Sequence, residues 1–204
     1  TGAGGTIGSE LSRQIAEFSP SHLSLLDASE FALYSADLEI KETHPNLPRN
    51  AIIADVRDKN RISRIFRIEK PDLVFHAAAL KHVPIVEAHP TEGILTNING
   101  TRIIADCCHE IGVSAMVLIS TDKAVNPANI MGASKRIAET YCQALDLEKT
   151  VKTRFVTVRF GNVLGSTGSV VPLFQRQIGN GGPLTVTPPE MQRFFMTVRE
   201  AVEL

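Results

Sequence analysis

Short apolar runs alternate along most of the chain with segments whose apolar residues recur at helical spacing. In the first helical segment, Ile7, Leu11 and Ile15 follow one another at intervals of four, which predicts a helix over 5–18. The same criterion predicts further helices over 29–42, 60–70, 90–111, 131–147 and 170–177. Apolar runs predict strands over 22–27, 51–55, 72–78, 114–121 and 153–160.

Apolar strands that alternate with amphipathic helices are typical of a parallel sheet covered on both faces. We therefore predict an α/β fold, a Rossmann-like doubly wound parallel sheet with right-handed crossovers. The pattern loosens into Gly- and Pro-rich loops after Gly161. We expect a nucleotide-binding domain over 1–160 and, over 161–204, the start of a small C-terminal substrate-binding lobe.

Composition narrows the class of protein. The net charge is −1 with both signs interspersed, which argues against a nucleic-acid partner. No apolar run approaches the ~18 residues of a membrane span, so we expect no membrane segment here. The three cysteines, Cys107, Cys108 and Cys142, have neither metal-site nor disulfide spacing. We expect them to pack in the core of a protein from a reducing, cytoplasmic compartment, without a bound metal.

The ends of the sequence suggest a piece of a longer polypeptide. The opening TGAGGTIG is a glycine-rich turn of the kind that follows a strand, so we expect the first strand of the sheet to be missing. The closing TVREAVEL has the pattern of a helix that is just beginning.

The opening turn predicts a dinucleotide site. Gly2, Gly5 and Gly8 precede a helix, whose N-terminus attracts a pyrophosphate, and we expect Thr6 and Ile7 to share in this binding. Asp27 ends the next strand, where a carboxylate bonds the adenosine ribose and repels a 2′-phosphate, which favours NAD over NADP. The alternative is that Asp27 caps the following helix. Asp55, with Val56, is placed to meet the adenine edge.

A second candidate stretch is HAAALKHVP, which follows the strand over 72–78. The small side chains of Ala77, Ala78 and Ala79 would let a flat cofactor lie against the backbone, and Lys81 could reach a sugar or phosphate. His76 and His82 lack other ligands at metal spacing, so we expect them to pack and hydrogen-bond.

The motifs TGAGGTIGSEL, HAAALKHVP, STDKAVNP, GASKR and RFGNVLGSTGSVVPLF together resemble the extended short-chain dehydrogenase/reductase superfamily. More narrowly they resemble the capsular-polysaccharide-type UDP-N-acetylglucosamine 4,6-dehydratases. This resemblance implies NAD-dependent conversion of a UDP-N-acetyl-hexosamine to a 4-keto-6-deoxy sugar nucleotide, for surface polysaccharide. It also implies a homo-oligomer. In this family the smaller soluble members have Tyr at the position of Met131, and the larger membrane-anchored members have Met. Met131 therefore implies that the chain is the cytoplasmic domain of a larger parent protein anchored in the inner membrane.

The resemblance assigns roles within STDKAVNPANIMGASK. Asp122, helped by Thr121, would be the general acid at the sugar C6 hydroxyl, and we expect burial beside the substrate to raise its pKa. Lys123 would be the base at C5. Lys135 would hold the nicotinamide ribose. Met131 cannot carry a proton, so we expect Asp122 also to receive the C4 hydroxyl proton, and we expect Tyr141 to pack in the core.

The last segment supplies candidate substrate contacts: Asn162, Ser169 and Arg193, the last suited to a diphosphate. Two alternatives remain open. One is an epimerase or reductase acting on a similar nucleotide sugar, which would not need the pair Asp122–Lys123. The other is a non-catalytic NAD-binding module whose redox site has decayed.

Overall fold

The computed structural model describes residues 1–148, 150, 152–166, 170–186 and 191–204. Its strands pair in parallel, β1 with β2 and, separately, β3 with β4 and β4 with β5. They are β1 (Leu23–Asp27), β2 (Arg49–Ile53), β3 (Leu73–His76), β4 (Ala115–Thr121) and β5 (Arg154–Phe160).

The first residues of the chain connect these two groups of strands. The Thr1 amino group donates to the Phe75 carbonyl at 2.8 Å, and the Ala77 N–H donates to the Thr1 carbonyl at 3.0 Å. On the other side, the Ala3 N–H donates to the Leu26 carbonyl at 3.1 Å. Residues 1–3 therefore lie between β1 and β3, where a doubly wound sheet has its first, central strand.

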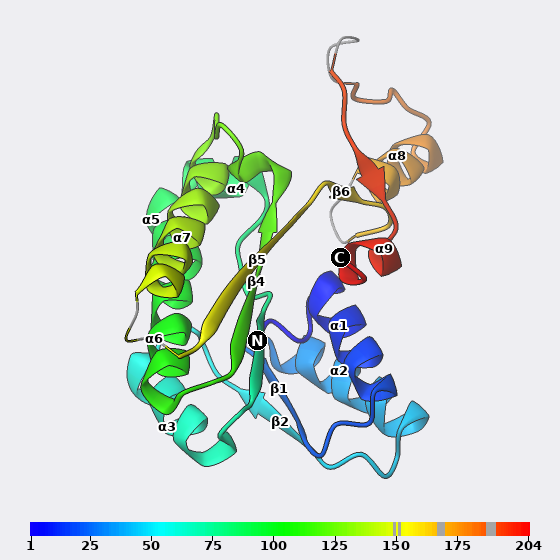
Figure 1. The fold of residues 1–204 in the computed structure, drawn as a ribbon. Helices are drawn as coiled ribbons and strands as arrows, with labels where there is room; N and C mark the ends of the chain where they lie inside the picture. The colour runs from blue at the N-terminus through cyan, green and yellow to red at the C-terminus, as the bar shows by residue number, and fades with distance from the viewer. Residues whose placement is uncertain (149, 151, 167–169, 187–190) are drawn as a thin grey trace.

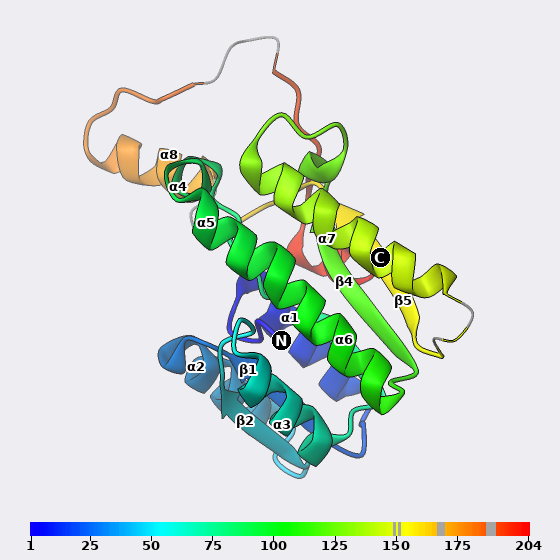
Figure 2. The ribbon, with the colours of Figure 1, turned by 90° about the vertical axis from the view of Figure 1, so that its left-hand side faces the viewer.

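Helices cover both faces of the strands (Figure 1). On one face lie α1 (Thr6–Glu17) and α2 (Glu30–Thr43), and on the other lie α3 (Lys59–Glu69), α6 (Thr101–Ile111) and α7 (Ile130–Leu147). Figure 2 shows α6 and α7 side by side over β4 and β5. The predicted α/β fold, a doubly wound parallel sheet, is confirmed.

The structure corrects two predicted elements and adds one. The second strand is Arg49–Ile53 rather than 51–55, because it pairs in register with β1 from Leu23 to Asp27. A short helix that we did not predict, α4 (Val83–Ala88), begins at a proline-containing first turn. The helix predicted over 90–111 consists of α5 (Pro90–Gly93), a π-helical segment η1 (Ile94–Gly100) and α6.

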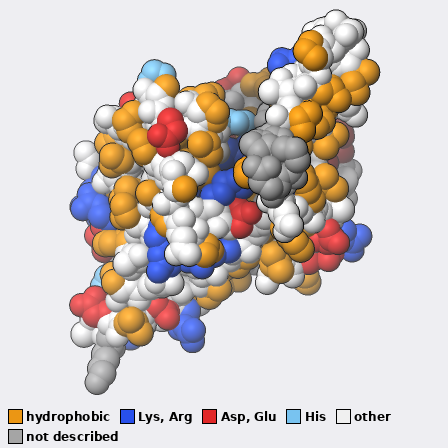
Figure 3. All heavy atoms as spheres, turned by 90° about the horizontal axis from the view of Figure 1, so that it is seen from above, with side chains coloured by type: hydrophobic (Ala, Val, Ile, Leu, Met, Phe, Trp, Pro, Cys, Tyr) orange, Lys and Arg blue, Asp and Glu red, His pale blue; other side chains and the backbone are white. Residues whose placement is uncertain are grey.

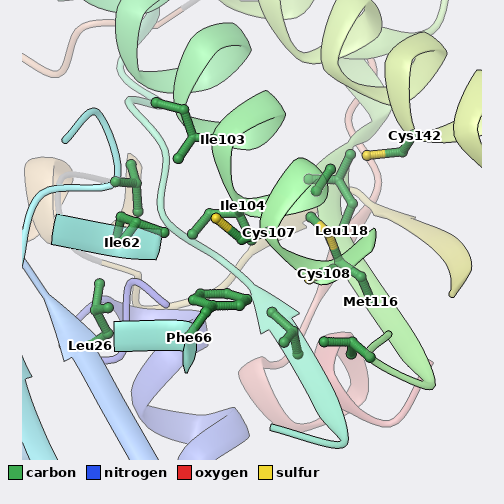
Figure 4. Close-up of a cluster of buried hydrophobic side chains, with 14 of the residues drawn as sticks. Leu26, Ile62, Phe66, Ile103, Ile104, Cys107, Cys108, Met116, Leu118 and Cys142 are labelled. Atoms are coloured by element: carbon green, nitrogen blue, oxygen red, sulfur yellow. The ribbon is translucent and has the colours of Figure 1, made fainter. Parts of the chain in front are cut away.

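The main core lies between the sheet and the helices α3, α6 and α7 (Figure 4). The prediction that the cysteines pack in the core is confirmed, since all three thiols are buried and free. Burial raises the pKa of each thiol, that of Cys142 to about 12. Such thiols stay protonated at neutral pH and serve as packing groups.

After β5 the chain leaves the large sheet. Two short strands, β6 (Asn162–Val163) and β7 (Phe195–Met196), pair in parallel, and helix α8 (Val170–Gly179) follows β6. Helix α9 (Val198–Val202) packs on α1, beside the glycine-rich turn (Figure 1). A domain boundary near Gly161 stays a prediction. No helix in the described ranges is long and apolar enough to cross a membrane.

Candidate active site

The glycine-rich turn is a tight cradle ahead of α1. Gly2 has φ +70°, and a Cβ there would lie 2.5 Å from the Ala78 nitrogen. A Cβ on Gly8 would lie 1.9 Å from the Gly2 carbonyl oxygen, too close for any side chain. Gly4, which the sequence analysis did not single out, lies against Ala32 of α2 in the same way. The turn therefore requires glycine at these positions. It leads into the N-terminus of α1, whose backbone N–H groups can bind an anion and whose first turn contains Thr6 and Ile7.

Asp27 holds this turn from the end of β1. Its Oδ2 accepts from the Gly4 N–H at 2.9 Å, and its Oδ1 accepts from the Ser29 N–H at 2.9 Å. The N-cap of α2 is Ser29, whose hydroxyl accepts from the Ala32 N–H. The alternative that Asp27 caps α2 is therefore wrong, because Ser29 is the N-cap and Asp27 only accepts from its N–H.

Asp55 lies two residues beyond the end of β2. It accepts from the Arg57 N–H at 2.9 Å and from Arg57 Nε at 2.8 Å, and Arg57 also pairs with Glu92 of α5 at 2.7 Å. The Arg57 guanidinium lowers the pKa of Asp55 below its usual value. Val56 is buried against Gly100. If Asp55 contacts adenine, the same carboxylate would therefore bond both the adenine and Arg57.

The loop after β3 is held by Asn97, a residue that we did not predict. Asn97 Oδ1 accepts from the Leu80 N–H at 2.8 Å, while its Nδ2 donates to the Leu80 carbonyl at 3.0 Å and to Ser134 Oγ at 2.9 Å. The fully buried amide thus fixes Ala77–Ala79, which are half-buried, against the start of α7. Its sequence signal was a polar residue inside the apolar face of ILTNING. Lys81 is exposed.

His76 is fully buried and hydrogen-bonds on both ring nitrogens. Its Nδ1 meets Thr1 Oγ1 at 2.6 Å and its Nε2 meets Thr101 Oγ1 at 3.0 Å. Burial lowers its pKa well below the usual value, so the ring is neutral. The packing prediction for His76 is confirmed, and His82 is exposed just before α4. Among the described residues no group of His, Cys, Asp and Glu has the arrangement of a metal site.

The predicted acid and base lie at the carboxyl end of β4, in the short turn η2 (Asp122–Ala124). Thr121 Oγ1 donates to Asp122 Oδ1 at 3.0 Å, and Lys123 Nζ donates to the same oxygen at 3.0 Å. Lys123 Nζ also donates to Asn162 Oδ1 at 2.9 Å. The side chain of Asp122 is 46% exposed here, because η2 follows the carboxyl end of β4. Its burial beside a substrate stays a prediction.

Helix α7 brings Met131 and Lys135 to the same edge. Asn129 caps the helix, and a Cβ on Gly132 would lie 2.2 Å from the Lys123 carbonyl oxygen, so the helix starts in contact with η2. Lys135 is 5% exposed and donates from Nζ to the Ile119 carbonyl at 2.6 Å. Burial lowers its pKa to about 8. Met131 is 3% exposed.

Tyr141 takes no part in this arrangement. Its hydroxyl donates to Asp106 of α6, and its ring packs against the main core, as predicted. Burial and this hydrogen bond raise its pKa to about 12. It is therefore no substitute for the tyrosine that position 131 lacks.

The remaining predicted residues lie nearer the end of the chain. Asn162 is in β6, where its N–H donates to the Phe194 carbonyl at 2.8 Å. Arg193 is exposed, and Ser169 lies outside the described residues. Figure 3 looks onto the carboxyl edge of the strands, where Lys, Arg, Asp and Glu side chains lie near the middle of the face. An open hollow at the edge strand β2, lined by Asp37, Arg49 and Arg61, contains none of the predicted site residues.

Similarity to known proteins agrees with this geometry. Residues 1–204 match the family described as polysaccharide biosynthesis protein. The chain belongs to this family. The match spans the glycine-rich turn, the acid–base pair and Lys135, so the resemblance noted from the motifs is confirmed.

Several members and relatives carry more specific names. The chain is 54% identical to the capsular polysaccharide biosynthesis protein CapD of Staphylococcus aureus, over 100% of this chain and 34% of that protein. It is 41% identical to a UDP-N-acetylglucosamine 4,6-dehydratase (inverting) of Campylobacter jejuni, over 86% of this chain and 54% of that protein. A UDP-glucose 4-epimerase of Rickettsia canadensis is 38% identical, over 87% of this chain and 53% of the epimerase. The chain therefore spans about a third to a half of these relatives.

A solved structure supports the fold over the whole chain. The X-ray structure of Pen from Bacillus thuringiensis superposes with a TM-score of 0.90 at 36% identity, covering 100% of this chain and 63% of Pen. The chain thus belongs to a polysaccharide biosynthesis family and is similar to nucleotide-sugar dehydratases and epimerases.

Proposed function

We propose that this protein catalyses the NAD-dependent 4,6-dehydration of a UDP-N-acetyl-hexosamine, UDP-N-acetylglucosamine being the first candidate. The observation that carries the proposal is Lys123, held between Asp122 and Asn162 at the carboxyl end of β4. An acid and a base side by side are what dehydration needs and what epimerisation does not. The product would be a 4-keto-6-deoxy sugar nucleotide for a surface polysaccharide.

The cradle at Gly2 and Gly8 fits a dinucleotide, because the missing Cβ atoms let the backbone of the turn pack closely on itself and on Ala78. A pyrophosphate would then meet the N-terminus of α1. Asp27 would bond the ribose hydroxyls with the lone pairs that Gly4 and Ser29 leave free. Lys135 would hold the nicotinamide ribose. When bound, NAD+ supplies reversible hydride transfer, so that the sugar is oxidised at C4 and reduced at C6.

The residues at β4 would move the protons. Oxidation at C4 makes the C5 hydrogen acidic, and the Lys123 amine would take that proton. The C6–O bond then breaks, and Asp122 would protonate the leaving hydroxyl so that water departs. Lys123 would return its proton to C5 as C6 is reduced. Lys81 and Arg193 would bind the diphosphate or sugar, with Asn162 and Ser169 as further contacts.

Met131 leaves the C4 hydroxyl proton without the usual acceptor. The hydrogen bond from Thr121 to Asp122 supports a route in which Asp122 takes this proton early and delivers one to C6 later. One carboxylate would then serve both steps, and Lys135 would only position the cofactor.

The test is incubation of UDP-N-acetylglucosamine with the full-length protein, followed by mass spectrometry and NMR. Loss of one water molecule supports the dehydratase, and the NMR spectrum of the product reports the configuration at C5. An unchanged mass with a new NMR spectrum would show an epimerase, the alternative that the Rickettsia relative favours. Unaltered substrate with bound NAD would indicate a binding module.

We further propose a cytoplasmic site of action and a homo-oligomeric assembly. The free buried thiols fit a reducing compartment. Light scattering of the full-length protein measures the oligomeric state, and a monomer at working concentration would contradict the second proposal.

A further inference from the structure

Glu139 is a buried carboxylate for which the proposed chemistry has no use. It is 0% exposed and lies on α7 four residues after Lys135, so the two side chains share one face of the helix. Both reach toward the strands beneath that face. Lys135 donates to the Ile119 carbonyl of β4, while Glu139 accepts from Arg159 of β5.

The strands place these contacts next to each other. Ser120 follows Ile119 in β4 and lies directly opposite Arg159 of β5. Arg159 Nε donates to Glu139 Oε1 at 2.9 Å, and Arg136 pairs with Oε2 at 3.2 Å. The side chains of the arginines are 35% and 46% exposed, so the carboxylate lies on the buried side of both.

A buried charge is costly unless an opposite charge compensates it. The Lys135 ammonium is such a charge, and its described acceptor is a neutral carbonyl. Glu139 is the carboxylate on the same face of the same helix. Glu139 raises the pKa of Lys135, but burial outweighs this effect and leaves the pKa at about 8.

Among the described residues, most other titratable groups on α7 or on elements near it are neutral or bonded to different partners. Neutral groups are His76 of β3 and the thiols Cys107, Cys108 and Cys142. Engaged groups are Asp122 and Lys123 with each other, Glu87 with the Ile130 N–H, Glu92 with Arg57, Asp106 with Tyr141, Asp146 with Arg154, and Arg102 with Asn99. His109 and Glu110 occupy the last turn of α6, at the end of the sheet opposite to η2.

We propose that Glu139 is the counterion that keeps the Lys135 ammonium charged, while Arg159 competes with Lys135 for the same carboxylate. Glu139 is then a positioning residue that acts through Lys135. The consequence for cofactor binding rests on the proposed role of Lys135 at the nicotinamide ribose. The electrostatic relationship itself does not depend on that role.

The test measures the titration of Lys135 in the full-length protein. Trace acetylation across a pH series, read by mass spectrometry of the peptide that carries Lys135, reports the pKa of this amine. Glu139→Gln should lower it by about one unit or more, because an opposite charge is removed. Arg159→Gln should raise it, because a competing positive charge is removed and Arg136 still holds Glu139.

The opposite signs distinguish a counterion from a structural link between α7 and β5. A purely structural pair would respond alike to both substitutions, so equal falls in the two variants would overturn the proposal, as would an unchanged pKa in Glu139→Gln. Glu148→Gln, an exposed position at the end of α7, is the matched control and should leave Lys135 unchanged. If Glu139→Gln does not fold, Arg159→Gln decides alone, and a fall would contradict the inference.

A second readout connects the pair to the cofactor. NAD+ affinity of Glu139→Gln should begin to weaken at a lower pH than that of the unmodified protein. A shifted Lys135 titration without any dehydration would refute the proposed function and leave this inference standing. Dehydration by the unmodified protein, together with an unshifted Lys135 titration in Glu139→Gln, would support the proposed function and refute this inference.

Discussion

Lys123 Nζ donates to Asn162 Oδ1 at 2.9 Å, and this hydrogen bond joins residues 39 positions apart in the chain. Asn162 is itself fixed in β6 by its N–H bond to the Phe194 carbonyl. The amine that we propose as the base is therefore oriented by the segment that follows the large sheet as well as by Asp122.

Asn162→Asp should reduce turnover by about tenfold or more at neutral pH. The new carboxylate would give Lys123 a second anionic partner, which stabilises the ammonium and withdraws the free amine that a base requires. Turnover should recover partly as the pH rises. The measurement is kcat against pH, with Asn180→Asp, an exposed residue after α8, as control. An unchanged pH profile would show that Asn162 does not act on Lys123.

Met131→Ala should be mild, with kcat lowered by less than about tenfold, because a thioether carries no proton and its loss removes only packing. Lys123→Ala should abolish dehydration while NAD stays bound. Steady-state rates of the two variants, compared under one condition, check this pair. A loss in Met131→Ala as large as that in Lys123→Ala would give Met131 a role in the chemistry.

Gly8→Ala should weaken NAD binding by more than about tenfold, since a Cβ there would lie 1.9 Å from the Gly2 carbonyl oxygen and the turn could not keep its shape. Calorimetric titration with NAD+ measures the effect. Gly179→Ala is the matched control, because a Cβ at Gly179 would meet nothing within 4 Å. Equal affinities in the two variants would remove the turn from the cofactor site.

Asp27→Ala should weaken NAD binding and narrow the preference for NAD over NADP. The carboxylate would repel a 2′-phosphate, and its loss also releases the N–H groups of Gly4 and Ser29. Binding constants for both cofactors provide the measurement. If the unmodified protein already prefers NADP, the ribose assignment fails.

Lys135→Met should stabilise the fold at pH 7 and abolish turnover. The buried lysine has a pKa of about 8, below the usual value of 10.5, so the unfolded state binds more protons between these values. Stability of the unmodified protein should therefore rise with pH over that range, whereas the variant should lack this rise. Removal of the buried charge should raise the free energy of unfolding by on the order of 1–3 kcal/mol at pH 7. Denaturant unfolding across pH tests both statements, and a less stable variant would contradict them.

The sequence pattern predicts those features that depend on residues close together in the chain. Gly2 and Gly5 precede a helix and Gly8 lies in its first turns, and the periodicity of Ile7, Leu11 and Ile15 indicates that helix. The four-residue spacing places Met131 and Lys135 on one face of α7 whatever surrounds them. The alternation of such helices with apolar strands was sufficient for the doubly wound sheet.

Partners from distant segments required the tertiary structure. Asn97 and Glu139 gave little signal, because their meaning depends on Leu80, Ser134 and Arg159, which only the folded sheet brings near. The bounds of β2 shifted because strand ends follow the register with β1. The exposure of Asp122 depends on where η2 lies relative to the sheet, which the local sequence does not determine. Hydrophobic period and glycine geometry are encoded residue by residue, whereas burial and ion pairing depend on packing between segments far apart in the chain.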